Sequence, residues 1–247
     1  MLYAGLAFAP GVGVPSAAKH RQEQMMASGK KPCVIKRCDE PVLLSGQVEN
    51  TAWSAAEPIG IDVFPWYTGG RRQLTTVRAL YDEQAIYLQF LCEDRHIWSR
   101  ATELNGAVWE DSCVEMFAIT DPAGSGYYNL EMNACGQMLM GFGPGRTDRK
   151  PITADLASAI TLRTSVPGQT KDDSPDDNGW WLAARVPFET IEAFTGQAAK
   201  PSAGSVWRGN FYRCGGKTDS QHACWNPIVN DHPDFHRPEF FGELVFA

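Results

Sequence analysis

Residues 75–92 read Thr-Thr-Val-Arg-Ala-Leu-Tyr, then Asp-Glu-Gln, then Ala-Ile-Tyr-Leu-Gln-Phe-Leu-Cys. In Thr75–Tyr81 the side chains alternate in character, which is the period of a strand with one buried face. Residues 82–84 have the composition of a turn, and Ala85–Cys92 is a more continuously apolar run. Two strand-like runs joined by a short polar turn predict an antiparallel β-hairpin.

Eight further strand-like runs lie on either side of this hairpin. They are residues 34–37, 112–120, 127–133, 137–142, 159–166, 180–187, 206–213 and 242–246. Helical periodicity is nearly confined to Phe188–Phe194, which predicts one or two helical turns after Pro187. Because the strands follow one another without intervening helices, we predict an all-β fold, an antiparallel β-sandwich of about ten strands with at most one or two short helices.

Length and charge limit the class of protein. A chain of 247 residues suits a single all-β domain. Its net charge of −7 and the lack of a basic cluster argue against a nucleic-acid partner. The most apolar stretch, Leu2–Ala18, is interrupted by proline and glycine, so no membrane span is expected. We expect residues 1–32 to form an N-terminal leader or disordered extension and residues 33–247 to form one domain.

The seven cysteines are spread along the chain without a Cys-x-x-Cys pair. They are Cys33, Cys38, Cys92, Cys113, Cys135, Cys214 and Cys224. The odd number leaves at least one thiol unpaired. Several lie in strand-like runs, where a reduced cysteine packs as a small apolar side chain. We therefore expect mostly reduced cysteines, a state compatible with a cytoplasmic protein.

The first candidate site is the segment Trp-Glu-Asp-Ser-Cys-Val-Glu-Met-Phe at residues 109–117. Strand parity places Cys113, Glu115 and Phe117 on one face. A buried carboxylate needs partners, and two sugar hydroxyls suit it because a carboxylate accepts several hydrogen bonds. Trp109 offers a flat apolar surface for a pyranose ring. The alternative is a tryptophan of the core beside a structural ion pair.

The second candidate site is the proline-punctuated loop at residues 230–242, which carries His232, Phe235 and His236. Binding groups often lie on such loops, and Phe235 offers a second stacking surface. Alternatively, the three phenylalanines of the loop pack it down as a lid. A zinc site would draw on Cys214, His222, Cys224, His232 and His236, but their spacing matches no known zinc pattern. The acidic segment 172–179 predicts a solvated turn at a hairpin tip, with a calcium loop as the alternative.

Catalysis has weaker support in the sequence than binding. The Gly-x-Ser-x-Gly, Walker and HExxH motifs are all missing. A glycosidase would need paired carboxylates, for which Glu110 and Glu115 are the candidates. These two have opposite strand parity, so they are not expected to face one another. We therefore expect no catalytic residue and favour a binding module over an enzyme.

Several motifs, taken in order, resemble carbohydrate-binding module family 9 and the related DOMON-like sandwiches. The most specific is at residues 109–117, which resembles W-E-x-D-x-V-E-x-F with one residue fewer between Glu and Asp. The others are the opening at 39–53, the hairpin at 77–90, the G-W strand at 179–188, Trp-Asn-Pro at 225–227 and the closing strand at 240–246. The resemblance covers residues 33–247.

This resemblance implies a sandwich of jelly-roll or immunoglobulin-like type that holds a sugar, often a chain end, between two aromatic rings. The first ring corresponds to Trp109, the second to Phe235, and the hydroxyl-binding carboxylate to Glu115. Glu131 stands where a basic sugar contact is expected, and His232 replaces a polar amide. The implied ligand-binding residues are Trp109, Glu115, Glu131, His232, Phe235 and His236.

The resemblance also implies a biological setting. The partner is a carbohydrate, the process is polysaccharide catabolism, and a separate glycoside hydrolase is a compatible companion. Secretion or a periplasmic location is favoured by the family. No cofactor is expected, although some members hold structural calcium.

Two other functions stay open at this point. DOMON-like relatives bind haem b, which needs an axial methionine or histidine pair. The methionine candidates are Met116, Met132, Met138 and Met140, although methionine in a strand is more often a core residue. The second alternative is an enzyme associated with glycoside hydrolysis that uses Glu110 or Glu115.

Overall fold

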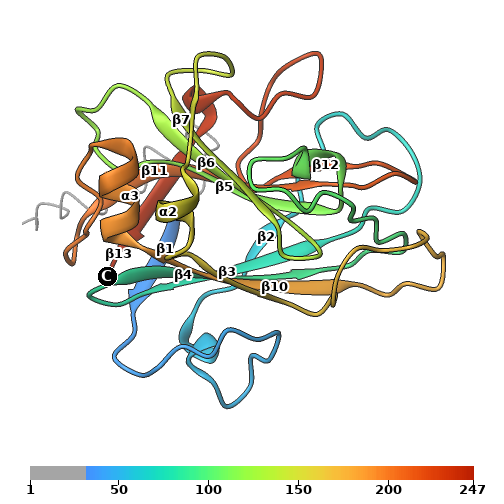
Figure 1. The fold of residues 1–247 in the computed structure, drawn as a ribbon, viewed down its shortest axis with the longest axis horizontal. Coiled ribbons are helices and arrows are strands. Elements are labelled where there is room, and N and C mark those ends of the chain that lie inside the picture. The colour runs from blue at the N-terminus through green and yellow to red at the C-terminus, as the bar shows by residue number, and fades with distance from the viewer. Residues whose placement is uncertain (1–31) are drawn as a thin grey trace, which may run out of the picture.

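The computed structural model describes residues 32–247, and the expected leader, apart from Pro32, lies outside this range. Within it are thirteen strands and two α-helices (Figure 1). The strands are β1 Pro32–Arg37, β2 Ile59–Ile61, β3 Thr75–Tyr81, β4 Ala85–Cys92, β5 Cys113–Ile119, β6 Tyr127–Asn133, β7 Met138–Gly143, β8 Lys150–Pro151, β9 Thr161–Thr164, β10 Trp180–Pro187, β11 Val206–Cys214, β12 His222–Cys224 and β13 Gly242–Phe246. The α-helices are α2 Ala154–Ala157 and α3 Phe188–Thr195, and the 3-10 helices are η1 Ala52–Ala55, η2 Val108–Glu110 and η3 Pro238–Phe240.

The strands form one strongly curled sheet in the order β8-β7-β6-β5-β11-β13-β1-β3-β4-β10-β9. Two short strands lie off this path, because β12 pairs with β11 and β2 pairs with β3. Strand β1 makes the corner: Pro32–Ile35 pair with β13, and Lys36 and Arg37 pair with β3. The sheet therefore has two halves, which are the upper and lower layers in Figure 1.

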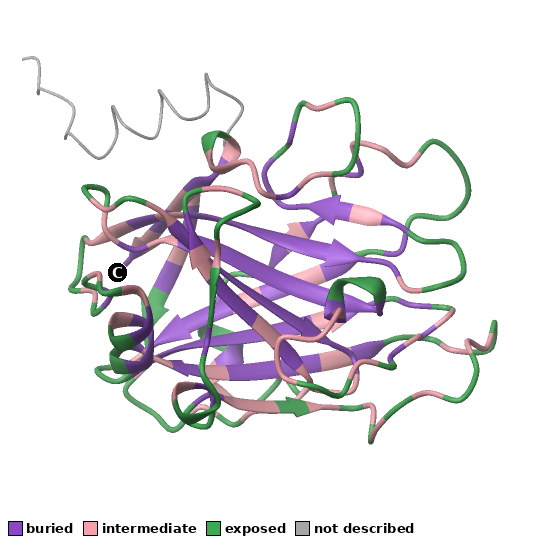
Figure 2. Ribbon diagram, turned by 45° about the horizontal axis from the view of Figure 1, so that its top comes forward, coloured by how far each residue is buried: buried purple, intermediate pink, exposed green. Residues whose placement is uncertain are grey.

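The main core lies between these two halves. Leu88 and Phe90 on β4 belong to the same buried cluster as Met116 on β5 and Phe211 on β11. The rings of Phe90 and Phe211 meet edge to face with centroids 6.3 Å apart. Figure 2 shows the strands mostly buried and the loops mostly exposed. Two sheet halves that bury facing apolar surfaces are consistent with a sandwich.

The prediction of a mostly β fold is confirmed. All ten predicted strands are present, and the three additional ones, β2, β8 and β12, have only two or three residues each. Helix α3 occupies the predicted place and ends at Gly196, whose φ of 73° suits a glycine after the last turn. Strand β1 departs from the purely antiparallel expectation, because it pairs in parallel with both neighbours. The strand order describes a curled half-barrel and not clearly a jelly-roll.

A buried ion pair ties the two halves together at one end of the core. Asp94, which follows β4, accepts hydrogen bonds from Arg213 on β11 at 2.5 Å, Ser112 at 2.7 Å and Trp180 on β10 at 3.1 Å. Both partners of the Asp94–Arg213 pair are almost fully buried. Since charges are buried only at a cost, this pair depends on its hydrogen bonds.

A second buried cluster covers the outer face of the upper half. Cys113 and Phe117 on β5, Tyr127 on β6 and Tyr212 on β11 pack there against residues of the segment 225–241. Strand parity explains the separation, because Val114 and Met116 on the same strand point into the main core. Much of this half is therefore covered on both faces, and a cavity opens on its outer face.

Two further expectations concern the whole chain. All seven cysteines are free thiols in this structure. None of the helices in residues 32–247 combines the length and apolar character needed to cross a membrane.

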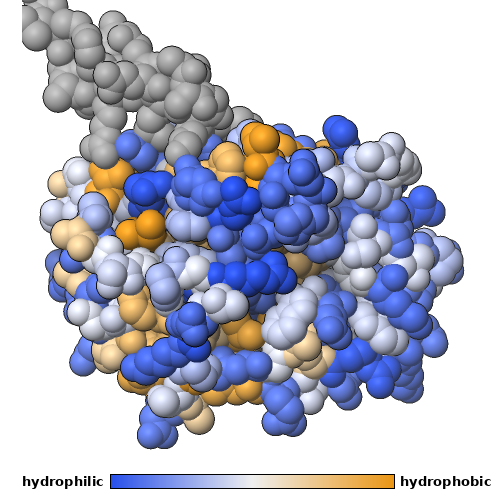
Figure 3. Space-filling model, turned by 90° about the horizontal axis from the view of Figure 1, so that it is seen from above, coloured by the Kyte–Doolittle hydropathy of each residue, from blue (hydrophilic) through white to orange (hydrophobic). Residues whose placement is uncertain are grey.

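Figure 3 looks onto the top of the molecule in Figure 1, where most of the visible described surface is hydrophilic and the apolar groups form small separate patches.

Candidate functional site

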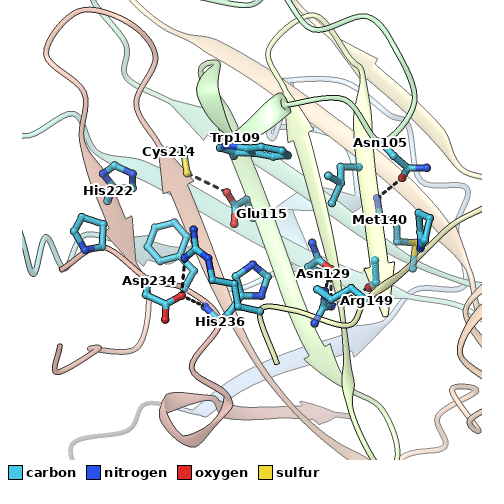
Figure 4. A pocket seen from close by; sticks show the side chains of 16 residues that line it. Asn105, Trp109, Glu115, Asn129, Met140, Arg149, Cys214, His222, Asp234 and His236 are labelled. Carbon is cyan, nitrogen blue, oxygen red and sulfur yellow. Dashed lines mark hydrogen bonds and ion pairs between the residues drawn. The ribbon is translucent and has the colours of Figure 1, made fainter. Parts of the chain in front are cut away.

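A cavity of about 450 Å³ opens on the outer face of the upper half of the sheet (Figure 4). Four strands, β5, β6, β7 and β11, contribute its floor. Two connecting segments contribute its sides, residues 144–149 between β7 and β8 and residues 225–241 between β12 and β13. Its volume is within the range of small-molecule sites.

Trp109 lies at the rim of this cavity, with 47% of its surface exposed. It belongs to the short helix η2, in which Val108 is fully buried. The buried carboxylate of Asp111 fixes the end of η2. It accepts hydrogen bonds from the backbone N–H groups of Arg100 and Ala101 and from the side chain of Asn133. The tryptophan is thus presented to solvent by a well-anchored turn.

Glu115 lies in the floor beside Trp109 and is only 2% exposed (Figure 4). Its Oε1 accepts a hydrogen bond from the thiol of Cys214 at 3.0 Å. Burial raises the pKa of Glu115 well above its ordinary value, and the nearby Glu131 raises it further, while the Cys214 contact acts in the opposite direction. The site therefore contains a carboxyl group that has lost water and has gained only one weak donor in return.

Glu131 lies beside Glu115 on the neighbouring strand and is not among the residues that line the cavity. The two residues are directly opposite one another on the antiparallel strands β5 and β6. Asn129 donates a hydrogen bond to one oxygen of Glu131 at 2.8 Å, and the other oxygen is buried without a partner. Burial raises the pKa of Glu131 to about 7, against the effects of Asn129, Arg149 and Arg146.

Arg149 supplies a positive charge at the opposite wall. Its guanidinium donates to the side-chain oxygen of Asn129 at 2.6 Å and to the carbonyls of Tyr127, Gly141 and Gly145 at 2.7–3.0 Å. It also lies over the Tyr127 ring, 4.4 Å from the centroid. Burial lowers the pKa of Arg149 below its ordinary value. The arginine is held in one position and no carboxylate bonds to it.

Two glycines of β7 make room for this arginine. A Cβ at Gly141 would lie 2.8 Å from the side-chain oxygen of Asn129 and 3.2 Å from Nε of Arg149. A Cβ at Gly143 would lie 2.7 Å from the carbonyl oxygen of Asp148. The Gly-Phe-Gly sequence in a strand is therefore the signal that another group approaches the backbone closely there.

The segment 225–241 forms the remaining wall. Phe235 is 7% exposed, and its ring stacks on Tyr212 with centroids 4.2 Å apart. Nδ1 of His236 lies 2.7 Å from the Tyr127 hydroxyl. Burial, together with Arg149 and Arg146, lowers the pKa of His236 to about 4, so this ring is neutral at pH 7. Asp234 forms an ion pair at 3.0 Å with Arg146, which joins the two segments.

The structure brings four of the six expected ligand-binding residues to this cavity: Trp109, Glu115, Phe235 and His236. Glu131 is the cross-strand neighbour of Glu115 but is not among the lining residues, and His232 is exposed and outside the lining. Glu110, a candidate for catalysis, is exposed and also outside it. Sequence reasoning missed Asn129, Arg146 and Arg149.

The residues considered for haem, zinc and calcium binding lie as follows in the structure. Met116, Met132, Met138 and Met140 belong to the main core cluster, although Met140 also reaches the cavity wall. Within residues 32–247 no group of three or more His, Cys, Asp or Glu side chains is arranged to hold a metal ion. In the acidic segment, Asp177 accepts a hydrogen bond from the Ile97 backbone and Asp173 contacts the Thr218 hydroxyl.

The chain is similar to known carbohydrate-binding proteins in both sequence and fold. The family model for carbohydrate-binding family 9 matches residues 48–246. The fold is similar to the crystal structure of a candidate carbohydrate-binding protein from Bacteroides uniformis, with a TM-score of 0.76 and 25% identity over 88% of this chain and 100% of the other. A search among curated proteins finds no match.

Two structures of a family 9 carbohydrate-binding module from Caldicellulosiruptor kristjanssonii share the fold at lower identity. The complex with cellotriose has a TM-score of 0.57 and 14% identity, over 87% of this chain and 93% of the other. The complex with glucose has a TM-score of 0.58 and 15% identity, over 88% and 96%.

Proposed function

The chain belongs to carbohydrate-binding family 9, and from that premise we propose that it binds a sugar in the cavity beside Trp109. The observation that carries the proposal is the pairing of a half-exposed tryptophan with a buried carboxyl group in one cavity. A pyranose ring has an apolar face that can stack on an indole and hydroxyls that can donate to a carboxylate.

In this proposal each wall has a distinct role. Trp109 supplies the stacking surface, and Glu115 accepts hydrogen bonds from hydroxyl groups. Phe235 is the second aromatic wall, and because its ring is already stacked on Tyr212 it contributes only its small exposed part. Asn105 and Asn129 also line the cavity. Each amide nitrogen already donates one hydrogen bond, to Ile152 and to Glu131 respectively, so its second N–H suits a sugar hydroxyl.

The expected affinity is modest. Aromatic stacking contributes about 0.5–1.5 kcal/mol beyond area burial, and a hydrogen bond to a charged group contributes about 1.5–3 kcal/mol. After the costs of association, such a site binds at roughly micromolar to millimolar concentration. This range suits a module that acts beside a separate glycoside hydrolase in polysaccharide catabolism.

A thermal-shift screen followed by calorimetry tests the proposal. The probes are glucose, cellotriose and a panel of other mono- and oligosaccharides. At least one sugar is expected to stabilise the protein and to bind the wild type with one site per chain. If no sugar in the panel binds, the proposed function is rejected.

The variant Trp109→Ala tests the place of binding. It is expected to abolish sugar binding while the melting temperature stays near that of the wild type, because the side chain is half exposed. The matched control is Trp98→Ala, which removes a partly exposed tryptophan that does not line the cavity. Unchanged affinity in the Trp109 variant would exclude the stacking role.

A further inference from the structure

Two buried carboxyl groups lie side by side at this site, Glu115 in the floor of the cavity and Glu131 on the neighbouring strand. Glu115 and Glu131 are directly opposed on β5 and β6, and they are only 2% and 5% exposed. Their side-chain hydrogen bonds come from the Cys214 thiol and the Asn129 amide, and neither carboxyl takes part in an ion pair. One oxygen of Glu131 has no partner. Two negative charges this close, without a bonded cation, repel one another strongly.

The titratable groups packed around the pair are mostly neutral. Burial raises the pKa of Cys113 on β5 and of Cys214 and Tyr212 on β11, so the two thiols and the phenol keep their protons at pH 7. Burial lowers the pKa of His222 on β12 and of His236 on the segment 225–241, so both imidazoles stay uncharged there. None of these five groups neutralises a carboxylate.

The charged groups lie on the two segments that form the sides of the cavity. Arg149 hydrogen-bonds to Asn129 and to backbone carbonyls, and Arg146 pairs with Asp234. The Asn129 hydrogen bond and both arginines lower the pKa of Glu131, and so favour its ionised form, against the effect of burial. No such effect reaches Glu115, which instead feels the charge of Glu131.

We propose that Glu115 and Glu131 share one proton near neutral pH, and that Glu131 thereby sets the protonation state of the carboxyl group that faces the sugar. Glu131 is a positioning residue, because it acts through Glu115 and does not line the cavity. The ligand part rests on the proposed sugar-binding function, whereas proton sharing is a property of the protein alone.

Sugar binding then involves the transfer of a proton, with no oxidation or reduction. Sugar hydroxyls donate to Glu115 most favourably when it is ionised. In the free protein the shared proton keeps Glu115 from being fully ionised, because two negative charges on this pair would repel one another. When a sugar binds, the proton passes to Glu131 or to solvent. Wild-type affinity therefore continues to rise with pH until both carboxyls can ionise.

Infrared titration of the sugar-free protein tests proton sharing directly. We expect the wild type to keep the absorption of about one protonated carboxyl group at pH 7. In Glu131→Gln, this band should disappear at a lower pH, because Glu115 no longer faces a negative charge. The control Glu110→Gln removes an exposed carboxylate outside the cavity and should leave the band unchanged.

Two outcomes would overturn proton sharing. One is a wild type without a protonated carboxyl group at pH 7, and the other is a band with the same pH dependence in Glu131→Gln. If that variant does not fold, Glu115→Gln makes the same infrared test with Glu131 left alone. Either result is obtained without a sugar, so it is independent of the proposed function.

Calorimetry with cellotriose from pH 5 to pH 9 tests the link to binding. Glu131→Gln should reach its full affinity at least about one pH unit below the wild type, and binding at an intermediate pH should be about tenfold tighter. Parallel pH profiles in the two proteins would exclude a positioning role for Glu131. If cellotriose binds neither protein, the sugar-binding role fails for this probe and the infrared result alone decides proton sharing.

Discussion

Glu115 shows how the surroundings of one side chain change its chemistry. In water a carboxylate has many hydrogen-bond donors, but here its one side-chain partner is the Cys214 thiol, a weak donor. Burial removes the hydrogen bonds that this carboxyl group makes to water in the unfolded chain. A ligand hydroxyl that donates to it would replace one of them. A buried acid at the cavity floor is therefore suited to receive a ligand hydroxyl.

The pH dependence of stability is a prediction at this scale. A carboxyl group whose pKa is raised in the folded state binds its proton more tightly there than in the unfolded chain. The free energy of unfolding therefore falls as pH rises from the ordinary value of about 4.5 through the folded value, which for Glu131 is about 7. We expect Glu131→Gln to melt at about the wild-type temperature at pH 5 and above it at pH 8.

The melting temperatures of the wild type and the variant must be compared at each pH, because the titration of His236 changes the free energy of unfolding in the opposite direction. Its pKa is lowered to about 4, so it makes the wild type more stable as pH rises from about 4 to about 6.5. That contribution is common to both proteins and cancels in their difference. A difference in melting temperature that stays constant from pH 5 to pH 8 would contradict the prediction.

At the scale of elements, strand β7 and the segment after it determine how the cavity wall is built. Gly141 and Gly143 leave the space that Arg149 occupies, and Arg149 in turn holds carbonyls of β6, β7 and the turn at Gly145. One side chain thus binds three pieces of backbone. These hydrogen bonds hold together the cavity wall beside Asn129.

Gly141→Ala tests this arrangement. The added methyl group would contact Asn129 and Arg149, so we expect a loss of about 1–3 kcal/mol in the free energy of unfolding, measured by chemical denaturation. Gly168→Ala is the matched control, because a Cβ at Gly168 has no atom within 4 Å. It should change stability by less than about 0.5 kcal/mol. Equal effects of the two substitutions would argue against the packing role of Gly141.

At the scale of the whole molecule, two features hold the halves of the curled sheet together. Strand β1 pairs with β13 at one end and with β3 at the other, so a single strand belongs to both halves. The buried Asp94–Arg213 pair joins the end of β4 to β11 across the core. Trp180 and Ser112 complete the hydrogen bonds of Asp94.

Asp94→Ala should therefore be strongly destabilising. The substitution leaves Arg213 charged in the core without its partner, which typically costs about 3–5 kcal/mol. Chemical denaturation measures the effect. The neighbouring Glu93→Ala removes an exposed partner of Arg71 and should cost less than about 1 kcal/mol. A similar small loss in both variants would show that the buried pair contributes little.

The main strands were predicted accurately because each one produces a local pattern of alternating or continuously apolar side chains bounded by turn residues. The hairpin of β3 and β4 matches the structure residue for residue, since alternation and turn composition are properties of neighbours in the chain. Trp109 and Glu115 were found for the same reason. Helix α2 was missed because four residues carry no helical periodicity.

Arg149 was missed because nothing next to it in the chain marks it. Its partners, Tyr127 and Asn129, are about twenty residues away, and only the spaced glycines of β7 hint at a close approach. His232 was predicted to bind the ligand because the family resemblance implies a polar group at its position in the loop. The structure leaves it exposed, since loop backbone does not follow a fixed periodicity.

The sequence by itself determined the mostly β class of fold, the positions of its main strands along the chain and the face that Glu115 shares with Cys113 and Phe117, because these depend on periodicity and composition over a few residues. Only the tertiary structure decided that Glu131 opposes Glu115, that Cys214 is its donor and that Arg149 forms the far wall. Register between strands and the path of loops depend on contacts between distant residues. The chemistry of this cavity arises from those contacts.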